Sequence, residues 1–242
     1  LRVIAWGDIY RILTDRFLNI NIPLGKLMNS YIFRNMEFGH ICEFFFRCEV
    51  MKMKAGDTLI EEGGAEDFFY VVLNGYGEVW IPELGERTPK KSYTLKPGDV
   101  FGEYSLITDK PSYATITMIT DSIVLCLDKK SFRELLANPI IREVGSHEAQ
   151  GMIKEDYKLI DIRWEEENEE VRIPGSIFIP INEIKNRYTE LDASVPYIVY
   201  CRSGVRSKVA SFLLNKLNFN TISLKGGIIE WPYEKEGLAV SS

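Results

Sequence analysis

The sequence predicts two folded domains in tandem: a small antiparallel β-barrel or sandwich with flanking helices, then an α/β domain with a mostly parallel sheet. Between residues 51 and 127, short alternating apolar runs are separated by glycine turns, which is typical of antiparallel β-structure. Past residue 146, short apolar strands alternate with helical segments. A chain of 242 residues, 45% hydrophobic and 26% charged, is long enough for two separate cores.

The formal net charge of -6 argues against nucleic acid as a partner, because phosphate binding needs a basic face. No run approaches the roughly 18 apolar residues that span a bilayer, so we expect no membrane segment. The cysteines and histidines lack zinc-ligand spacing, and no metal site is predicted. Scattered cysteines fit a reducing compartment, which predicts a cytoplasmic protein. The residues concerned are Cys42, Cys48, Cys126, Cys201, His40 and His147.

Residues 1–40 are predicted to form a helical N-terminal segment. Apolar residues recur at helical spacing across 9–18, and Pro23 interrupts the pattern. A further short apolar helix is expected before residue 50. Two interpretations stay open: the segment packs on the β-domain that follows, or it is the end of an upstream domain.

The domain at 41–138 is predicted to contain short strands and a closing helix. The expected strands lie at 58–60, 68–73, 77–81, 92–95 and 114–118. Residues 128–136 then read as a helix packed behind the strands, and Asn138-Pro139 ends it.

The domain at 146–242 is predicted to be α/β, and the boundary is expected between Asn138 and Ser146. Short apolar runs predict strands at 159–162, 177–179, 198–200 and 221–224. The acidic run at 165–170 is predicted to be a solvated surface loop, because contiguous charges cannot all converge on one ion.

One segment of the β-domain reads Phe101-Gly102-Glu103-Tyr104-Ser105, followed by Lys110-Pro111-Ser112-Tyr113. It resembles the phosphate-binding cassette of cyclic nucleotide-binding domains, and the similarity extends over 25–137. The resemblance implies a β-roll or jelly-roll and cAMP or cGMP as a regulatory ligand, with helix-start N–H groups at the phosphate and Glu103 at the ribose. The implied pocket residues are Gly102, Glu103, Tyr104, Ser105, Ser112 and Tyr113.

Two positions depart from that family's pattern. Ser112 stands where the family has the arginine that neutralises the phosphate, and a hydroxyl brings no charge. Losing a charge-assisted hydrogen bond forfeits ~1.5–3 kcal/mol. The ring of Tyr113 either stacks on a purine or fills the pocket. The domain is therefore either a nucleotide sensor or a degenerate sensor kept as an interaction or dimerisation module.

A single cysteine lies where a strand passes into a helix, in Tyr200-Cys201-Arg202-Ser203-Gly204-Val205-Arg206-Ser207. The preceding residues are apolar, and Val209, Phe212, Leu213 and Leu217 recur at helical spacing after the loop. Such a loop points the N–H groups of a helix start toward its centre, which stabilises a thiolate and attracts an anion. Arg202 and Arg206 add positive charge.

Four ordered motifs over 146–240 resemble a single-domain rhodanese, a sulfurtransferase family. Besides the cysteine loop, they are Leu159-Ile160-Asp161-Ile162-Arg163, Arg172-Ile173-Pro174-Gly175-Ser176-Ile177 and Leu224-Lys225-Gly226-Gly227. Arg172 replaces the family's usual histidine, and Trp164 replaces an acidic residue. Neither position is the nucleophile.

The resemblance implies that the Cys201 thiolate takes sulfur from a small sulfur-donor anion such as thiosulfate, becomes a persulfide and passes the sulfur to a thiol acceptor. Arg202 and Arg206 are expected to hold the donor, and no cofactor or metal is required. The N–H groups of Ser203, Gly204, Val205 and Ser207 are expected to cradle the sulfur, while Asp161 and Arg163 support the loop. A homodimer is compatible with this reading.

Two other functions stay open. Cysteine phosphatases leave one more residue between Cys and Arg than the four between Cys201 and Arg206, and Ser207 occupies the phosphatase arginine's place. The shorter loop favours sulfur over phosphate. The second alternative is a non-enzymatic regulatory or cyclic-nucleotide-sensing protein with an inactive rhodanese module.

Overall fold

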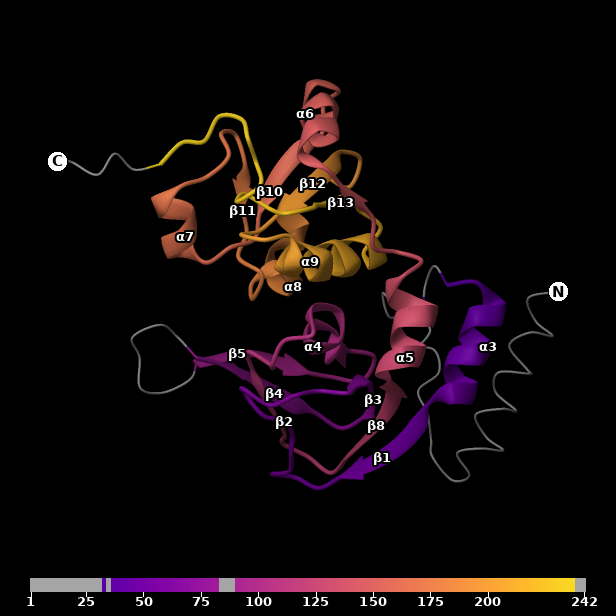
Figure 1. Cartoon of the computed structure of the whole chain (residues 1–242). Helices are drawn as coiled ribbons and strands as arrows, with labels where there is room; N and C mark the ends of the chain where they lie inside the picture. The colour runs from indigo at the N-terminus through magenta and orange to yellow at the C-terminus, as the bar shows by residue number, and fades with distance from the viewer. Residues whose placement is uncertain (1–31, 34–35, 83–89, 238–242) are drawn as a thin grey trace. The chain divides into compact units, whose positions relative to one another are not determined.

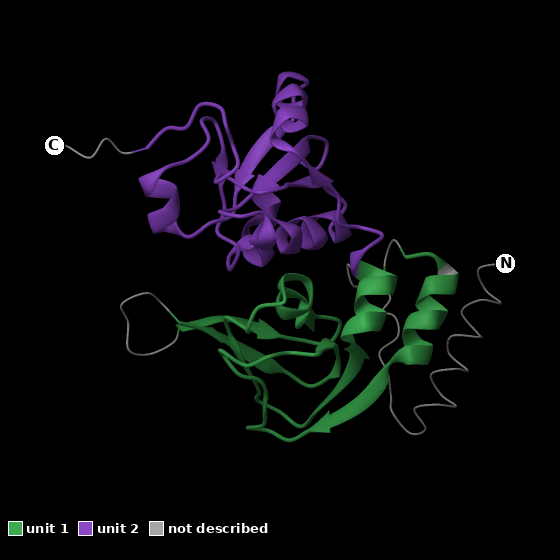
Figure 2. Ribbon diagram, viewed as in Figure 1, with its two compact units in different colours: residues 1–136 green, residues 137–242 purple. Residues whose placement is uncertain are grey.

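The structure is a computed structural model that describes residues 32–33, 36–82 and 90–237. The chain divides into two compact units, residues 1–136 and residues 137–242 (Figure 2). Most of the predicted helical segment at 1–40 lies outside the described residues. The later apolar helix is confirmed as α3, Phe38–Arg47, whose Phe44 and Phe45 are buried.

The residues of the first unit that the structure describes form two four-stranded antiparallel sheets (Figure 1). One has the order β1-β8-β3-β6, with β1 at Glu49–Met53, β8 at Ser122–Asp128, β3 at Phe68–Asn74 and β6 at Val100–Phe101. The other has the order β2-β7-β4-β5, with β2 at Thr58–Ile60, β7 at Thr115–Met118, β4 at Gly77–Ile81 and β5 at Lys90–Leu95. One apolar cluster takes residues from both sheets, among them Tyr70, Val124, Ile116 and Met118. The predicted antiparallel β-domain is confirmed.

Besides α3, the described part of the first unit contains two further helical segments. Helix α4, Glu103–Thr108, follows Gly102, and α5, Lys129–Phe132, continues as a π-helical turn at Arg133–Ala137. The side chain of Asp128 accepts a hydrogen bond from the Ser131 N–H at 3.0 Å, which caps α5. The helical stretch ends ahead of Asn138-Pro139, as predicted.

The second unit is built on a five-stranded sheet in the order β11-β10-β12-β13-β9, and every strand pair is parallel. The strands are β9 Glu143–Val144, β10 Lys158–Asp161, β11 Ile177–Phe178, β12 Pro196–Tyr200 and β13 Asn220–Leu224. The helices are α6 Ser146–Lys154, α7 Glu165–Glu170, α8 Ile184–Arg187, a 3-10 turn Tyr188–Glu190 and α9 Val205–Lys216. The α/β prediction is confirmed.

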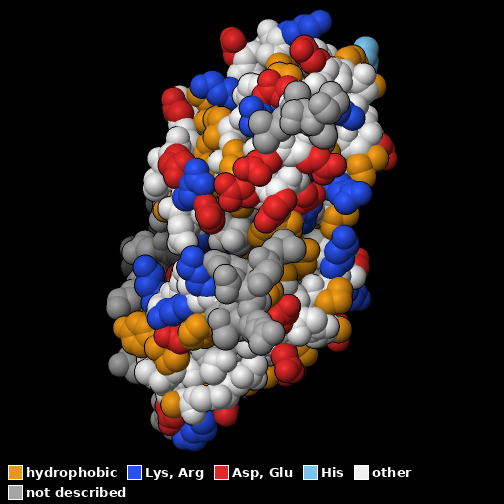
Figure 3. Space-filling model, turned by 90° about the vertical axis from the view of Figure 1, so that its left-hand side faces the viewer, with side chains coloured by type: hydrophobic (Ala, Val, Ile, Leu, Met, Phe, Trp, Pro, Cys, Tyr) orange, Lys and Arg blue, Asp and Glu red, His pale blue; other side chains and the backbone are white. Residues whose placement is uncertain are grey.

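The acidic run corrects one prediction, because Glu165–Glu170 forms helix α7 rather than a loop. Glu165, Glu166 and Glu167 lie in the first turn of α7. Carboxylates there interact favourably with the positive end of the helix dipole and so stabilise the helix. Glu167 also accepts a hydrogen bond from the Trp164 N–H at 3.2 Å. Figure 3 shows acidic side chains gathered on one face of the molecule, and Glu165, Glu166, Glu169 and Glu170 are exposed.

Candidate functional site

The cysteine loop lies at the carboxyl end of β12 and leads directly into α9. Cys201 follows the last residue of β12, and α9 begins at Val205. The Cys201 side chain is 1% exposed, whereas Arg202 and Ser203 are exposed. The predicted passage from strand through a short loop into a helix is confirmed.

Glycines allow two segments to approach the cysteine closely. Gly204 caps α9 with φ at +84°, and a Cβ there would meet backbone atoms of residues 224 and 226 at 3.0 Å. A Cβ on Gly227 would collide with the carbonyl oxygen of Cys201. That carbonyl accepts a hydrogen bond from the Ile228 N–H at 2.9 Å. The peptide after Cys201 is therefore held in one orientation by the 226–228 turn.

Two buried serines lie behind the sulfur. Cys201 Sγ is 3.7 Å from Ser207 Oγ, and Ser207 Oγ is 2.8 Å from Ser223 Oγ. Ser207 also donates to the Gly204 carbonyl at 3.0 Å. Sequence reasoning included Ser207 but missed Ser223, because no local signal marks a serine in β13 as a neighbour of the loop.

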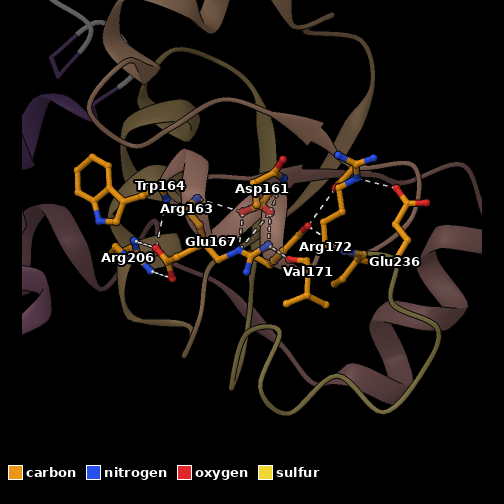
Figure 4. A network of polar contacts seen from close by, with 12 residues as sticks. Asp161, Arg163, Trp164, Glu167, Val171, Arg172, Arg206 and Glu236 are labelled. Carbon is orange, nitrogen blue, oxygen red and sulfur yellow. Dashed lines mark hydrogen bonds and ion pairs between the residues drawn. The ribbon is translucent and has the colours of Figure 1, made fainter. Parts of the chain in front are cut away.

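The two loop arginines differ in their surroundings. Arg202 is exposed, whereas Arg206 donates to both carboxylate oxygens of Glu167 at 2.7 and 2.8 Å (Figure 4). Burial opposes the ionisation of Glu167, but the hydrogen bonds and charge of Arg206 outweigh it and lower the pKa of Glu167. Arg206 thus joins the first turn of α9 to α7. Sequence reasoning missed Glu167 inside the acidic run.

A fully buried ion pair lies at the end of β10. Asp161 is 0% and Arg163 2% exposed, and their closest N–O distance is 2.6 Å. The carboxylate also accepts from the Arg163 N–H at 3.0 Å and from Asn168 Nδ2 at 2.9 Å. Arg163 donates onward to the Val171 carbonyl. The pair therefore fastens the 161–171 segment that carries Glu167 (Figure 4).

Arg172, which departs from the rhodanese pattern, meets the C-terminal part of the described chain. Its N–H and carbonyl exchange backbone hydrogen bonds with Glu236 at 2.6 and 2.8 Å. The side chains form an exposed ion pair at 2.6 Å (Figure 4). This bridge joins residue 236 to the segment that follows α7.

In the β-domain, four of the predicted pocket residues, Gly102, Glu103, Tyr104 and Ser105, lie at the start of α4. Gly102 has φ at +91°, and a Cβ there would lie 2.6 Å from the Phe68 carbonyl oxygen, so only glycine fits. Helix α4 spans six residues, and two of them, Glu103 and Ser105, are buried at 5% and 4% exposure. A tight glycine turn thus leads into a short helix at the segment where the sequence predicts the phosphate-binding cassette.

In the second half of the predicted cassette, the side chains of Ser112 and Tyr113 contact other groups of the β-domain. Ser112 Oγ donates to the Ala114 carbonyl at 2.9 Å. The ring of Tyr113 lies edge-on to Tyr104 with centroids 4.6 Å apart, and Tyr113 packs against the cluster between the two sheets. The hydroxyl and the ring that stand in the family's phosphate and base positions are thus used within the fold.

Across the part of the chain that the structure describes, no group of three or more His, Cys, Asp or Glu side chains is placed to hold a metal ion. In the same residues, no helix is long and apolar enough to cross a membrane.

Each of the two units matches the model of one protein family. Residues 50–138 match the model of the cyclic nucleotide-binding domain, and residues 146–233 match that of the rhodanese-like domain. The chain belongs to the rhodanese-like family through its second unit, and its first unit is similar to the cyclic nucleotide-binding domain.

Three known proteins illustrate these matches. "Putative sulfurtransferase YtwF" of Bacillus subtilis is 32% identical over 96 residues, which cover 39% of this chain and 93% of that protein. A cAMP-dependent protein kinase regulatory subunit of Blastocladiella emersonii is 30% identical over 121 residues, covering 50% of this chain and 30% of that protein. The solved rhodanese-related protein of Thermoplasma volcanium aligns with a TM-score of 0.38 and 31% identity, over 39% of this chain and 97% of that one. The chain thus spans under a third of the length of that regulatory subunit.

Proposed function

We propose that the second unit is a sulfurtransferase whose sulfur carrier is Cys201. The observation that supports this most directly is the position of Sγ, buried at the carboxyl end of β12 and at the start of the twelve-residue helix α9. A helix start offers N–H donors and positive potential to an anionic sulfur. Burial among apolar strands raises the pKa of the Cys126 thiol to about 12, so we assign no sulfur-carrying role to Cys126.

The proposed reaction has two balanced steps. The Cys201 thiolate attacks the outer sulfur of a thiosulfate-like donor, the donor's S–S bond breaks, and its electron pair leaves with sulfite. The Cys201 persulfide takes up a proton from water, and an acceptor thiolate then attacks its outer sulfur. The electron pair of the breaking S–S bond returns to Sγ, so a free persulfide leaves and the thiolate is restored.

The surroundings of the two arginines suggest separate roles. Arg202 is exposed beside the thiol, and we assign to it the contact with the anionic donor. Both terminal nitrogens of Arg206 donate hydrogen bonds to the Glu167 carboxylate. We therefore assign to Arg206 the positioning of the first turn of α9. This division refines the expectation that both arginines hold the donor.

The test is transfer of sulfur from thiosulfate to cyanide by the full chain and by Cys201→Ser. We expect activity in the wild type and its loss in the variant, with Cys42→Ser as the matched control that keeps activity. Mass spectrometry of the wild type after incubation with thiosulfate should show Cys201 one sulfur atom heavier. Turnover that survives in Cys201→Ser would exclude this nucleophile.

For the first unit we propose a regulatory role with a cyclic nucleotide, cAMP or cGMP, as the ligand class. The match of residues 50–138 and the likeness to a kinase regulatory subunit support this. The neutral Ser112 predicts weak binding, because its hydroxyl donates to Ala114 and carries no charge for the phosphate. Calorimetry with both nucleotides tests it, and no heat at millimolar ligand would favour an interaction module instead.

A further inference from the structure

A chain of two hydroxyl groups leads away from the reacting sulfur into the interior of the second unit. Ser207 comes from the first turn of α9 and Ser223 from β13, while Cys201 follows β12. Cys201 is 1% exposed and both serines are 0% exposed. The distances from Sγ to Ser207 Oγ and onward to Ser223 Oγ are 3.7 and 2.8 Å. On this inner side the sulfur therefore faces a buried hydroxyl.

The hydrogens of this chain can point in either direction, because a serine hydroxyl both donates and accepts. With Cys201 as a thiol, S–H donates to Ser207 Oγ, and the Ser207 hydrogen is given to the Gly204 carbonyl at 3.0 Å. With a thiolate, rotation of one hydroxyl lets Ser207 donate to Sγ. Ser223 can then donate to Ser207 Oγ, since those oxygens are within hydrogen-bond distance.

We propose that Ser207 is a catalytic hydrogen-bond donor to the Cys201 thiolate and that Ser223 is the positioning residue that orients it. The proposal rests on the sulfur transfer assigned above to Cys201. It gives Ser207 a side-chain role beyond the backbone N–H expected from the sequence, and it adds Ser223 to the site.

The Ser207 hydroxyl acts whenever Sγ carries charge: in the free thiolate that attacks thiosulfate, and again at the step where charge returns to Sγ. When an acceptor thiolate attacks the outer sulfur, the new S–S bond forms as the bond to Sγ breaks, and the electron pair goes to Sγ. Ser207 O–H needs only a rotation to meet that charge, and no proton leaves the serine. In a buried setting such a bond is stronger than in water, because little solvent competes for it.

The experiment measures the thiolate of Cys201 directly, as ultraviolet thiolate absorbance against pH in the full chain minus that of Cys201→Ser. Single-turnover persulfide formation from thiosulfate is followed in parallel. The variants are Ser207→Ala, Ser207→Thr and Ser223→Ala. Ser211→Ala is the matched control, because Ser211 is a 0% exposed serine one turn further along α9 whose hydroxyl has no hydrogen-bond partner within the described chain.

We expect Ser207→Ala to move the midpoint of thiolate formation up by about one pH unit and to slow persulfide formation about tenfold at neutral pH. Ser223→Ala should shift both in the same direction by a smaller amount, Ser207→Thr should stay near wild type, and Ser211→Ala should change neither. A midpoint in folded Ser207→Ala that equals wild type, or an equal shift in Ser211→Ala, overturns the proposal.

Two further outcomes distinguish a failure of this proposal from a folding defect and from a failure of the proposed sulfur transfer. If Ser207→Ala does not fold, an unshifted midpoint in Ser223→Ala overturns the proposal. If the wild type forms no persulfide, the proposed sulfur transfer fails, while the absorbance midpoints still decide whether the hydroxyls stabilise the thiolate.

Discussion

The buried ion pair at the end of β10 gives the sharpest stability prediction. Replacing Asp161 by Asn removes the negative charge that faces Arg163, which is 2% exposed and whose other acceptor, the Val171 carbonyl, is neutral. Breaking a buried pair by removing one partner costs about 3–5 kcal/mol, because an uncompensated charge stays in the interior. We expect Asp161→Asn to lower the free energy of unfolding of the second unit by that amount.

The same unit offers a matched exposed pair. Arg172 and Glu236 are also joined at 2.6 Å, but their side chains are 48% and 47% exposed. Surface pairs contribute about 0–1 kcal/mol, so Arg172→Ala should cost little. Removing both buried charges in Asp161→Leu/Arg163→Met should cost less than Asp161→Asn alone.

The assay is urea unfolding of the full chain followed by hydrogen-exchange mass spectrometry. Peptides from β10 and β12 report on the second unit, and peptides from β3 and β8 are the internal reference. Burial would be the wrong explanation if Asp161→Asn and Arg172→Ala lowered stability equally, or if Asp161→Asn cost less than about 1 kcal/mol.

Three further predictions concern other contacts. Ser112→Arg should tighten cAMP binding about 10- to 100-fold in calorimetry, because it restores a charge for the phosphate. Glu167→Gln should lower the free energy of unfolding at neutral pH by about 1–3 kcal/mol. Because the folded pKa of Glu167 is lowered, this stabilisation is full above the unfolded pKa of about 4.3 and disappears as pH falls through the folded value. Gly75→Ala should destabilise the β-domain by more than about 1 kcal/mol in thermal unfolding, since φ is +91° and a Cβ would collide with Ser122.

Each of these has a result that contradicts it. Unchanged calorimetry in Ser112→Arg would mean that the missing charge does not limit binding. A difference between wild type and Glu167→Gln that persists at acidic pH would assign the effect to packing. A Gly75→Ala domain that melts with the wild type would show that the turn accommodates a side chain.

The sequence predicted many elements of both units because their local patterns agree with the final structure. The strand at 77–81 has a short apolar run, Val79-Trp80-Ile81, after a glycine turn, and in β4 its residues alternate between buried and half-buried. Helix α7 was missed for the opposite reason. Its six residues, Glu165–Glu170, contain five glutamates and no apolar stripe, so no periodicity marks a helix.

The candidate site also has a part that the local sequence predicts and a part that it does not. The chemical identity of the nucleophile and the turn around it are local, since Cys201, Gly204 and α9 follow one another along the chain. The partners of that loop come from distant positions: Glu167 is 39 residues before Arg206, and Ser223 is 16 residues after Ser207. A local pattern carries no information on which strands lie side by side.

The sequence by itself therefore determined that a β-domain precedes an α/β domain, and that a cysteine begins the loop into a helix. The tertiary structure alone decided which groups surround that cysteine. The parallel pairing of β12 with β13 sets Val199 beside Ser223, and so brings a hydroxyl next to Ser207. The physical reason is that sheet order and register are fixed by burial of whole strands, a property that no single segment of the sequence encodes.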